Sequence, residues 1–300
     1  MRALIFIMTP ILILTFILAS RFVSWEKLKG VDKNAHKHLS AGTKLLREGK
    51  NYKAITAFTQ AIEIEPKYAE AYIKRGIAYY YLAHYKEAID DYTHTLSLKQ
   101  YIADAYVRRA DAYRALNDFS NAINDYTASL NQRKNAFVMS KRAEVYLETG
   151  KINKALEDYD YIVKHRPSAI AYYDRGSAYY EKYLLSKEND ADLKLALADF
   201  NKSIERQPLF AIAFIRRGNV HAYMDQPKPK ESDYAQAIDI LTDAINNWKD
   251  NKHQLITFFL WRATAYAKNN NTDKAKEDIE KTYGLIGEII LNKINFSAIL

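Results

Sequence analysis

The sequence lacks cysteine altogether and is poor in glycine and proline. Its 300 residues include 9 Gly, 6 Pro and no Cys. Without thiols the chain has no disulfide framework, no thiolate metal site, no cysteine nucleophile and no lipid-anchor cysteine. Gly and Pro are too few for the many turns of a β-sandwich or for Gly-rich nucleotide-binding loops. Long helices joined by short turns fit this composition better.

Catalytic and metal-binding motifs are also missing. The sequence contains no Walker loop, no G-x-S-x-G and no H-E-x-x-H. His36 and His38 are two residues apart, so on a helix they face two directions, and we interpret them as surface histidines rather than metal ligands. We therefore expect no catalytic residue, no metal and no cofactor, and the chain is predicted not to be an enzyme.

An uncharged apolar run occupies residues 3–20, directly after Met1 and Arg2. At 1.5 Å per residue this run spans about 27 Å, just short of the hydrocarbon core of a bilayer, and residues 21–25 extend it to the interface. A small-x-small cleavage site is poor here, because Ile17 and Leu18 precede Ala19 and Ser20. We interpret residues 1–25 as a signal segment or, preferably, an uncleaved membrane anchor through residues 3–23, and residues 26–34 as a linker.

The charges around that run leave its orientation open. Arg21, Lys27, Lys29 and Lys33 come after it whereas only Arg2 precedes it, which by the positive-inside rule keeps the bulk of the protein cytoplasmic. Signal-like segments at an extreme N-terminus more usually deliver the rest of the chain across the membrane. A membrane-anchored or exported protein is expected, with the periplasmic or extracytoplasmic side favoured.

A period of 34 residues runs through the rest of the chain. KRGIAYYYLAHYKEAIDDY from Lys74 aligns without gaps with RRADAYRALNDFSNAINDY from Arg108, and KRAEVYLETGKINKALEDY from Lys141 has the same pattern. Extending outward gives seven copies over residues 35–289, which start at residues 35, 69, 103, 136, 169, 211 and 256. Such self-similarity is typical of a repeat architecture.

The spacing shared by the copies resembles that of the tetratricopeptide repeat family. Position 8 is Gly or Ala in all seven copies, position 20 is Ala, and position 24 is large and apolar or aromatic, with Ala237 and Leu241 assigned to positions 20 and 24 of the sixth copy. The small residues let two helices approach closely while the large ones fill the space beside them. The resemblance implies an all-α, right-handed α-solenoid of seven antiparallel helix pairs, each a helix A followed by a helix B.

Two copies are longer than the others. The fifth has eight extra residues within LLSKENDADLKL from Leu184, and the sixth has seven within MDQPKPKESDYAQ from Met224. Both are predicted to lie in the turn between helices A and B, as longer helices in the fifth copy and as a loop around Pro227 and Pro229 in the sixth. Residues 290–300 are interpreted as a capping tail, or alternatively as a dimer contact, because Ile286, Ile290 and Ile294 share one helical face.

By resemblance, helix A positions 2, 5, 6, 9, 12 and 13 line a concave groove in this family. The side chains at those positions are basic and aromatic here, which suits an acidic or aromatic peptide; a generally basic solvated surface is the alternative. The candidate partner-binding residues are Lys74, Tyr80, Tyr81, Arg108, Lys141, Tyr173, Tyr180, Arg216, Tyr223 and Trp261.

Position 7 is Arg in six copies, and we interpret these arginines as structural rather than ligand-binding. Five of the six copies that have this Arg also have an Asp at position 23, and the first copy lacks both, with Ala41 and Ala57. In the sixth copy Asp239 is the expected partner of Arg217, one position early. A bidentate guanidinium–carboxylate pair between helices A and B is predicted. The other predicted pairs are Arg75 with Asp91, Arg109 with Asp125, Arg142 with Asp158, Arg175 with Asp199, and Arg262 with Asp278.

These patterns predict a non-catalytic scaffold that binds a protein or peptide in the concave groove. A cationic groove for RNA or an acidic polymer is an alternative, although the net charge of +8 is modest and no long basic run is present, which favours a peptide. A second alternative is an envelope-complex assembly factor that acts as a homodimer through its C-terminal tail.

Overall fold

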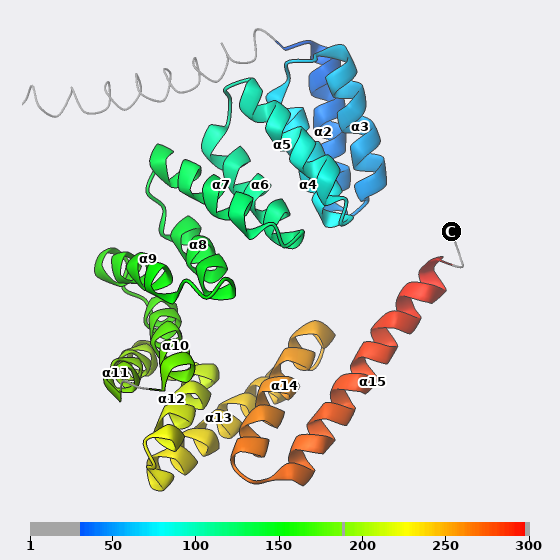
Figure 1. Cartoon of the computed structure of the whole chain (residues 1–300). Helices are drawn as coiled ribbons and strands as arrows, with labels where there is room; N and C mark the ends of the chain where they lie inside the picture. Colours follow the sequence, from blue (N-terminus) through cyan, green and yellow to red (C-terminus); the bar gives the residue numbers. More distant parts are fainter. Residues whose placement is uncertain (1–30, 188–189, 298–300) are drawn as a thin grey trace, which may run out of the picture. The chain divides into compact units, whose positions relative to one another are not determined.

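The computed structural model describes residues 31–187 and 190–297, which form only helices, without strands (Figure 1). Consecutive helices pair in antiparallel fashion, so that each pair is one helix A followed by one helix B, as the sequence predicts. The helices are α2 (Lys33–Arg47), α3 (Asn51–Ile64), α4 (Ala69–Tyr81), α5 (Tyr85–Ser97), α6 (Ile102–Ala115), α7 (Phe119–Gln132), α8 (Ala136–Glu148), α9 (Ile152–His165), α10 (Ala169–Ser186), α11 (Asp190–Arg206), α12 (Ala211–Tyr223), α13 (Pro227–Asn247), α14 (Lys252–Lys268) and α15 (Thr272–Ser297).

The predicted membrane segment, residues 1–25, lies outside the described residues. Among the helices of residues 31–187 and 190–297, none is both long enough and apolar enough to cross a bilayer.

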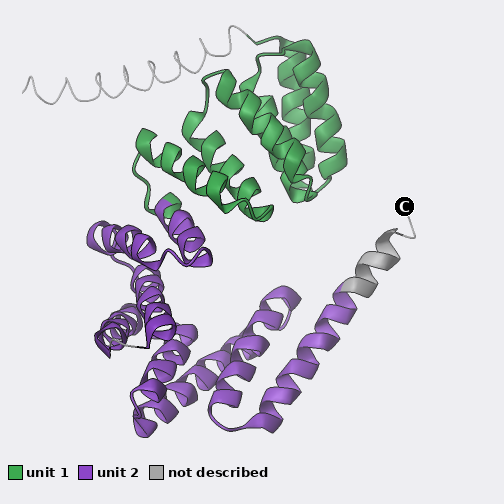
Figure 2. Ribbon diagram, in the orientation of Figure 1, with its two compact units in different colours: residues 1–138 green, residues 139–300 purple. Residues whose placement is uncertain are grey.

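The chain divides into two compact units, residues 1–138 and residues 139–300 (Figure 2). The boundary falls near the start of α8, between the third and fourth repeats. Unit 1 therefore holds the first three repeats and unit 2 the last four. The 34-residue period predicts no such boundary, because the pattern of small and large residues runs on unchanged.

Short turns join helix A to helix B in the same way in most repeats. The residue at position 15 has a positive φ, which is 73° at Gly49 and 59° at Ala83. The next residue donates its backbone N–H back to the carbonyl of position 11, as from His84 to Tyr79 at 3.0 Å. This is the Schellman arrangement that ends helices. The non-glycine residues Ala83, Asn117, Asp225 and Asn270 take the same backbone conformation, so glycine is not required there.

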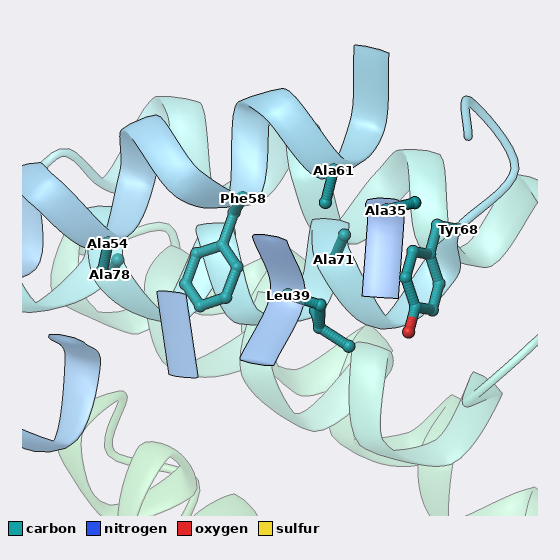
Figure 3. Packing of buried hydrophobic residues seen from close by; sticks show 8 residues of the cluster. All are labelled: Ala35, Leu39, Ala54, Phe58, Ala61, Tyr68, Ala71 and Ala78. Atoms are coloured by element: carbon teal, nitrogen blue, oxygen red, sulfur yellow. The ribbon is translucent and has the colours of Figure 1, made fainter. Parts of the chain in front are cut away.

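Close helix packing depends on the small residue at position 8. A Cβ added to Gly76 would lie 2.6 Å from Cε1 of Tyr92, and one added to Gly42 would lie 2.6 Å from Cε1 of Phe58. Figure 3 shows the Phe58 ring of α3 pointing into a buried cluster that also contains Ala71 and Ala78 of α4. The aromatic ring of helix B thus fills the space that a missing side chain leaves on helix A.

The fifth repeat accommodates its extra residues as the sequence predicts, by lengthening both helices. Helix α10 has 18 residues and α11 has 17. The close contact between positions 8 and 24 is kept in this repeat, because a Cβ added to Gly176 would lie 3.1 Å from Cε1 of Phe200.

The predicted insertion in the turn of the sixth repeat is wrong. Asp225 has the regular positive φ of 53°, and Pro227 is the first residue of α13 rather than part of a loop. Proline fits there because the first turn of a helix has no N–H bonds to lose. Tyr234, not Leu241, packs on Gly218, with 2.7 Å between its Cε1 and an added Cβ. Ala237 accordingly stands at position 27 rather than position 20, and the seven extra residues lengthen the C-terminal half of α13.

The last helix continues through the predicted boundary at residue 289. Helix α15 runs without a break from Thr272 to Ser297. The segment interpreted as a separate capping tail is therefore, as far as Ser297, an extension of helix B of the seventh repeat.

Candidate functional site

The arginine at position 7 is held by two repeats at once. Arg109 Nε donates to Asp125 Oδ2 at 2.7 Å, and its Nη2 donates to Asp125 Oδ1 at 2.8 Å. Its remaining nitrogen, Nη1, donates to the hydroxyl of Thr93 at 2.9 Å, on helix B of the preceding repeat. All three guanidinium nitrogens are therefore occupied within unit 1.

The same bidentate geometry recurs in the other repeats that have this arginine. The Nη2 to Oδ1 distance lies between 2.6 and 2.8 Å in each pair. The pairs are Arg75 with Asp91, Arg142 with Asp158, Arg175 with Asp199, Arg217 with Asp233, and Arg262 with Asp278.

Asp239 is not the partner of Arg217, which corrects the expectation for the sixth repeat. The partner is Asp233, sixteen residues after the arginine, as in the regular repeats. The pairing results directly from the position of the extra residues, which come after Asp233 and not before it.

Aromatic rings lie over the faces of most of these guanidinium groups. The Arg109 guanidinium lies 5.7 Å from the Tyr106 ring and 5.9 Å from the Tyr113 ring. Such cation–π contacts add stability when the cation is partly desolvated. The hydrogen bond to Asp125 raises the pKa of Arg109 above its ordinary value, against the opposing effect of burial. The hydrogen-bond donors of these arginines are thus already used within the fold, and few remain for a ligand.

Reasoning from the sequence missed the bond from Nη1 to the preceding repeat. The residue that accepts this bond differs in type from repeat to repeat, so a search for a repeated residue does not find it. Four of the acceptors stand at position 25: Thr59 for Arg75, Thr93 for Arg109, Asp160 for Arg175 and Asn201 for Arg217. Arg262 donates instead to Thr242, seven residues beyond position 25 of the sixth repeat. Seven residues are about two helical turns, so Thr242 lies on the same face of the lengthened α13.

In unit 1, the predicted binding residues on α4 and α6 range from half-buried to exposed, and the charges of Lys74 and Arg108 are locally balanced. Lys74 Nζ lies 3.5 Å from Glu70, and Arg108 Nε donates to Asp104 at 2.8 Å, each one helical turn away. Tyr81 is 65 % exposed. The Tyr80 ring is half-buried and lies 5.3 Å from the ring of Tyr85, edge to face.

In unit 2, the predicted aromatic residues divide into packed and accessible ones. Tyr180 is only 5 % exposed and belongs to a core cluster, and burial raises its pKa to about 12. Tyr173 is half-buried against Phe200 and Phe210, with ring centroids 6.0 and 5.2 Å away. Tyr180 presents almost no surface, so its assignment to a partner-binding groove needs correction: it serves packing. Tyr173 packs on its neighbours but keeps part of its surface, and its assignment stays a prediction.

Four other predicted residues of unit 2 keep some accessible surface. Tyr223 is about half exposed, and its ring lies 5.9 Å from that of Tyr180. Arg216 is half-buried beside Tyr180, and Trp261 is half-buried with its ring 6.4 Å from that of Phe258. Lys141 on α8 is half-buried as well.

Position 6 of the fifth repeat is acidic rather than basic, and a second acidic residue lies near it. Asp174 of α10 occupies that position, and burial, together with the negative charge of Glu144 on α8, raises its pKa to about 7. The helix A surface of unit 2 is therefore not uniformly cationic. Asp174 is visible in the sequence, but its approach to Glu144, thirty residues earlier, is not.

Among the described residues, no group of three or more His, Asp or Glu side chains is arranged to hold a metal ion. His36 instead lies 3.1 Å from the Tyr68 hydroxyl, measured from its Nδ1.

Family models match three stretches of the chain. A TPR repeat model matches residues 42–82, and two tetratricopeptide repeat models match residues 103–135 and 140–188. These three stretches are therefore similar in sequence to tetratricopeptide repeats. A search of curated proteins found no match.

Solved structures with the same fold cover most of the chain. A tetratricopeptide repeat protein from Parabacteroides merdae has a TM-score of 0.63 at 16% identity, over 85% of this chain and 94% of its own. The C-terminal part of a TPR repeat-containing protein from Cytophaga hutchinsonii has a TM-score of 0.58 at 19% identity, over 82% and 95%. YrrB, described as a TPR protein with an unusual peptide-binding site, has a TM-score of 0.50 at 23% identity, over 62% and 93%. The fold is that of a tetratricopeptide α-solenoid.

Proposed function

We propose that the protein is a non-catalytic scaffold that binds a peptide or protein partner on its helix A surfaces. One observation carries this proposal. The position 7 arginines are held in internal ion pairs. On the same helices, the position 6 cations Lys74 and Arg108 stay partly exposed and the ring of Tyr81 is largely exposed. The surface that remains for a ligand combines partly exposed cations with aromatic rings, which suits an acidic or aromatic segment.

The repeat structure makes such a surface rigid before a partner arrives. Arg109 ties helix A to its own helix B and to the preceding repeat, so the side chains on helix A keep their spacing. A partner then binds without much ordering cost to the scaffold. The Arg108 to Asp104 pair is exposed and therefore weak, so a partner carboxylate can replace Asp104 at little cost.

A peptide is the same class of ligand as that named for YrrB, which shares the fold. A polyanion such as RNA is the weaker alternative, because Glu144 and Asp174 would face its phosphates in unit 2. The two differ in salt dependence: phosphate contacts give a steep logarithmic loss of affinity with salt, and a largely apolar peptide contact does not.

The test is chemical crosslinking of the full chain in its native cells, followed by identification of the bound partners. The variant Lys74→Glu, Arg108→Glu and Lys141→Glu reverses three position 6 cations. A matched control, Lys53→Glu, Lys86→Glu and Lys164→Glu, makes the same charge change at exposed sites on the B helices α3, α5 and α9. We expect the first variant to lose the partners and the control to keep them. Recovery of identical partners by both variants contradicts the proposal.

We also propose that residues 3–23 hold the scaffold at a membrane or direct its export, on the ground of their uncharged apolar composition. Cell fractionation of the full chain and of a variant without residues 1–25 tests this. Equal recovery of both in the soluble fraction contradicts it.

Homodimerisation through the C-terminal tail remains a separate proposal, and it rests on the apolar residues from 290 onward in the sequence. Light scattering of residues 26–300, with and without residues 290–300, measures it directly. A mass that does not depend on the tail removes this alternative.

A further inference from the structure

On helix α15 the side chain at position 24 is exposed, whereas every other helix B of the described chain buries it. The aromatic residue at position 24 is at most 3 % exposed in the first six repeats. Its counterpart on α15, Ile279, is 39 % exposed, and Tyr283, one turn further on, is 70 % exposed. Ile286 continues the same face and is 38 % exposed. The residues at position 24 of the other repeats are Phe58, Tyr92, Tyr126, Tyr159, Phe200 and Tyr234.

In the other repeats, helix A of the next repeat contributes to this burial. Phe58 of α3 shares a buried cluster with Ala71 and Ala78 of α4. Phe200 of α11 shares one with Val220 of α12. The face of α15 is thus an interface of a kind that the chain itself uses repeatedly, and here its second helix is missing among the described residues.

The polar half of that interface is present on α15 as well. In earlier repeats, the residue at position 25 accepts a hydrogen bond from Nη1 of the next arginine, as Thr93 does from Arg109 at 2.9 Å and Asn201 from Arg217 at 2.7 Å. Position 25 of the seventh repeat is Glu280, which is exposed and carries two acceptor oxygens. A carboxylate binds a guanidinium more strongly than a hydroxyl does.

The opposite end of the repeats does not supply a matching helix. Helix α2 has Ala41 at position 7, where the later repeats have arginine, and exposes Lys37 and Lys44 on either side of it. This polar face is what a terminal repeat needs for solubility. Stacking α2 of a second copy on α15 would place these polar groups against Tyr283 without any arginine for Glu280. Helix α15 has no arginine either, so pairing two α15 helices leaves Glu280 equally unmatched.

We propose that the α15 face formed by Ile279, Glu280, Tyr283 and Ile286 docks an amphipathic helix of a partner protein that carries an arginine. The apolar side of that helix covers Ile279 and Tyr283, and its guanidinium donates to Glu280, as the chain's own A helices do on the preceding B helices. This surface is separate from the position 6 residues of the helix A surfaces, and its occupant has a different chemistry: cationic and helical rather than acidic.

A labelled helical peptide tests the proposal on the full chain. The probe is the α6 segment, residues 102–118, held helical by a hydrocarbon staple across positions 104 and 108, which carry the solvent-exposed Arg108 pair. The matched probe replaces Arg109 by Gln. Fluorescence anisotropy measures binding of both probes to the unaltered chain and to the variants Glu280→Gln, Tyr283→Lys and Leu185→Lys. Leu185 is 73 % exposed on α10, away from α15, and is the control for loss of an exposed apolar side chain.

We expect saturable binding that Tyr283→Lys abolishes and Leu185→Lys leaves unchanged. Glu280→Gln should weaken the arginine probe by about tenfold, the effect of one charged hydrogen bond, and should leave the Arg109→Gln probe unaffected. Absence of saturable binding, or equal losses with Leu185→Lys, overturns the proposal. It is also overturned if the chain sediments as a dimer that Tyr283→Lys dissociates. Binding that appears only after removal of residues 1–25 would assign the face to the chain's own N-terminal segment instead.

Discussion

The guanidinium of Arg109 makes a bidentate pair with Asp125, at 2.7 and 2.8 Å, while its third nitrogen reaches Thr93 of the preceding repeat. One side chain therefore joins three helices of unit 1. A row of arginines on neighbouring helices resembles a site for an anionic ligand, but this geometry assigns them to the fold. The proposed partner binding therefore relies on the residues beside them.

Removal of the Asp125 carboxylate should destabilise the protein strongly. The variant Asp125→Ala leaves the partly buried Arg109 charge without its partner, at a cost of about 3–5 kcal/mol in the free energy of unfolding. Urea denaturation measures this. The control Asp104→Ala breaks the exposed pair with Arg108 and should cost at most about 1 kcal/mol. Equal effects of the two substitutions would contradict the structural role of Arg109.

The bond between repeats should have a smaller and separable effect. Thr93→Val keeps the shape of the side chain and removes the acceptor for Nη1 of Arg109, at a cost of about 1 kcal/mol. In a variant that already lacks the Arg109 guanidinium, the same substitution should cost less, because Thr93 then has no such bond to lose. A double-mutant cycle from urea denaturation gives the coupling energy. A coupling of zero would show that this bond does not stabilise the contact between repeats.

Glycine substitutions separate packing from helix propensity. Gly76→Ala places a Cβ 2.6 Å from Tyr92 and should cost about 1–3 kcal/mol, since the buried ring must shift. Gly284→Ala meets nothing within 4 Å inside α15 and should stabilise the protein by roughly 0.5–1 kcal/mol through helix propensity. Thermal unfolding of both variants checks the opposite signs. If Gly76→Ala is neutral, position 8 is not the point of closest approach.

Stability should depend on pH through Asp174. Its pKa is raised from the ordinary value of 3.8 to about 7, first by burial and then by Glu144. The folded protein therefore binds a proton that the unfolded chain releases, so this contribution is complete below about pH 4 and is lost as the pH rises toward 7. Asp174→Asn should be more stable than the unaltered protein by roughly 1–3 kcal/mol at pH 8 and equally stable at pH 4.

Urea denaturation at several pH values measures this difference, and Asp104→Asn, at an exposed site, is its control. A difference between Asp174→Asn and the unaltered protein that stays constant from pH 4 to 8 would show that Asp174 does not titrate in this range.

The helical repeats were predictable because every repeat packs its two helices through the same contact. A small residue at position 8 must face a large ring at position 24, and the 34-residue period carries both along the chain, as with Gly76 and Tyr92. The sixth repeat misleads for a physical reason. Its seven extra residues make about two helical turns, so Tyr234 and Leu241 lie on the same face of α13 and both are buried. The sequence pattern fits either one, and only the contact of Tyr234 with Gly218 decides between them.

The candidate site was predictable only in part. Positions on helix A identify Lys74, Arg108 and Tyr81, which the structure leaves at least partly exposed. Burial of Tyr180 depends on neighbouring helices, and no local pattern reveals it. The sequence pattern does not reveal the bond from Arg109 to Thr93, because the residue that accepts it differs from repeat to repeat.

The central claim is that the acidic or aromatic peptide partner binds on the A helices rather than on the B helices of the same repeats. Tyr81 of α4 and Tyr52 of α3 offer a matched pair for testing it, since the two side chains are 65 % and 69 % exposed and differ in the helix that carries them. A photo-crosslinking phenylalanine analogue at each position, in separate full chains expressed in the native cells, reports which face contacts a partner. The account predicts a crosslinked partner from position 81 and none from position 52. A partner captured from position 52 and not from position 81 would contradict it.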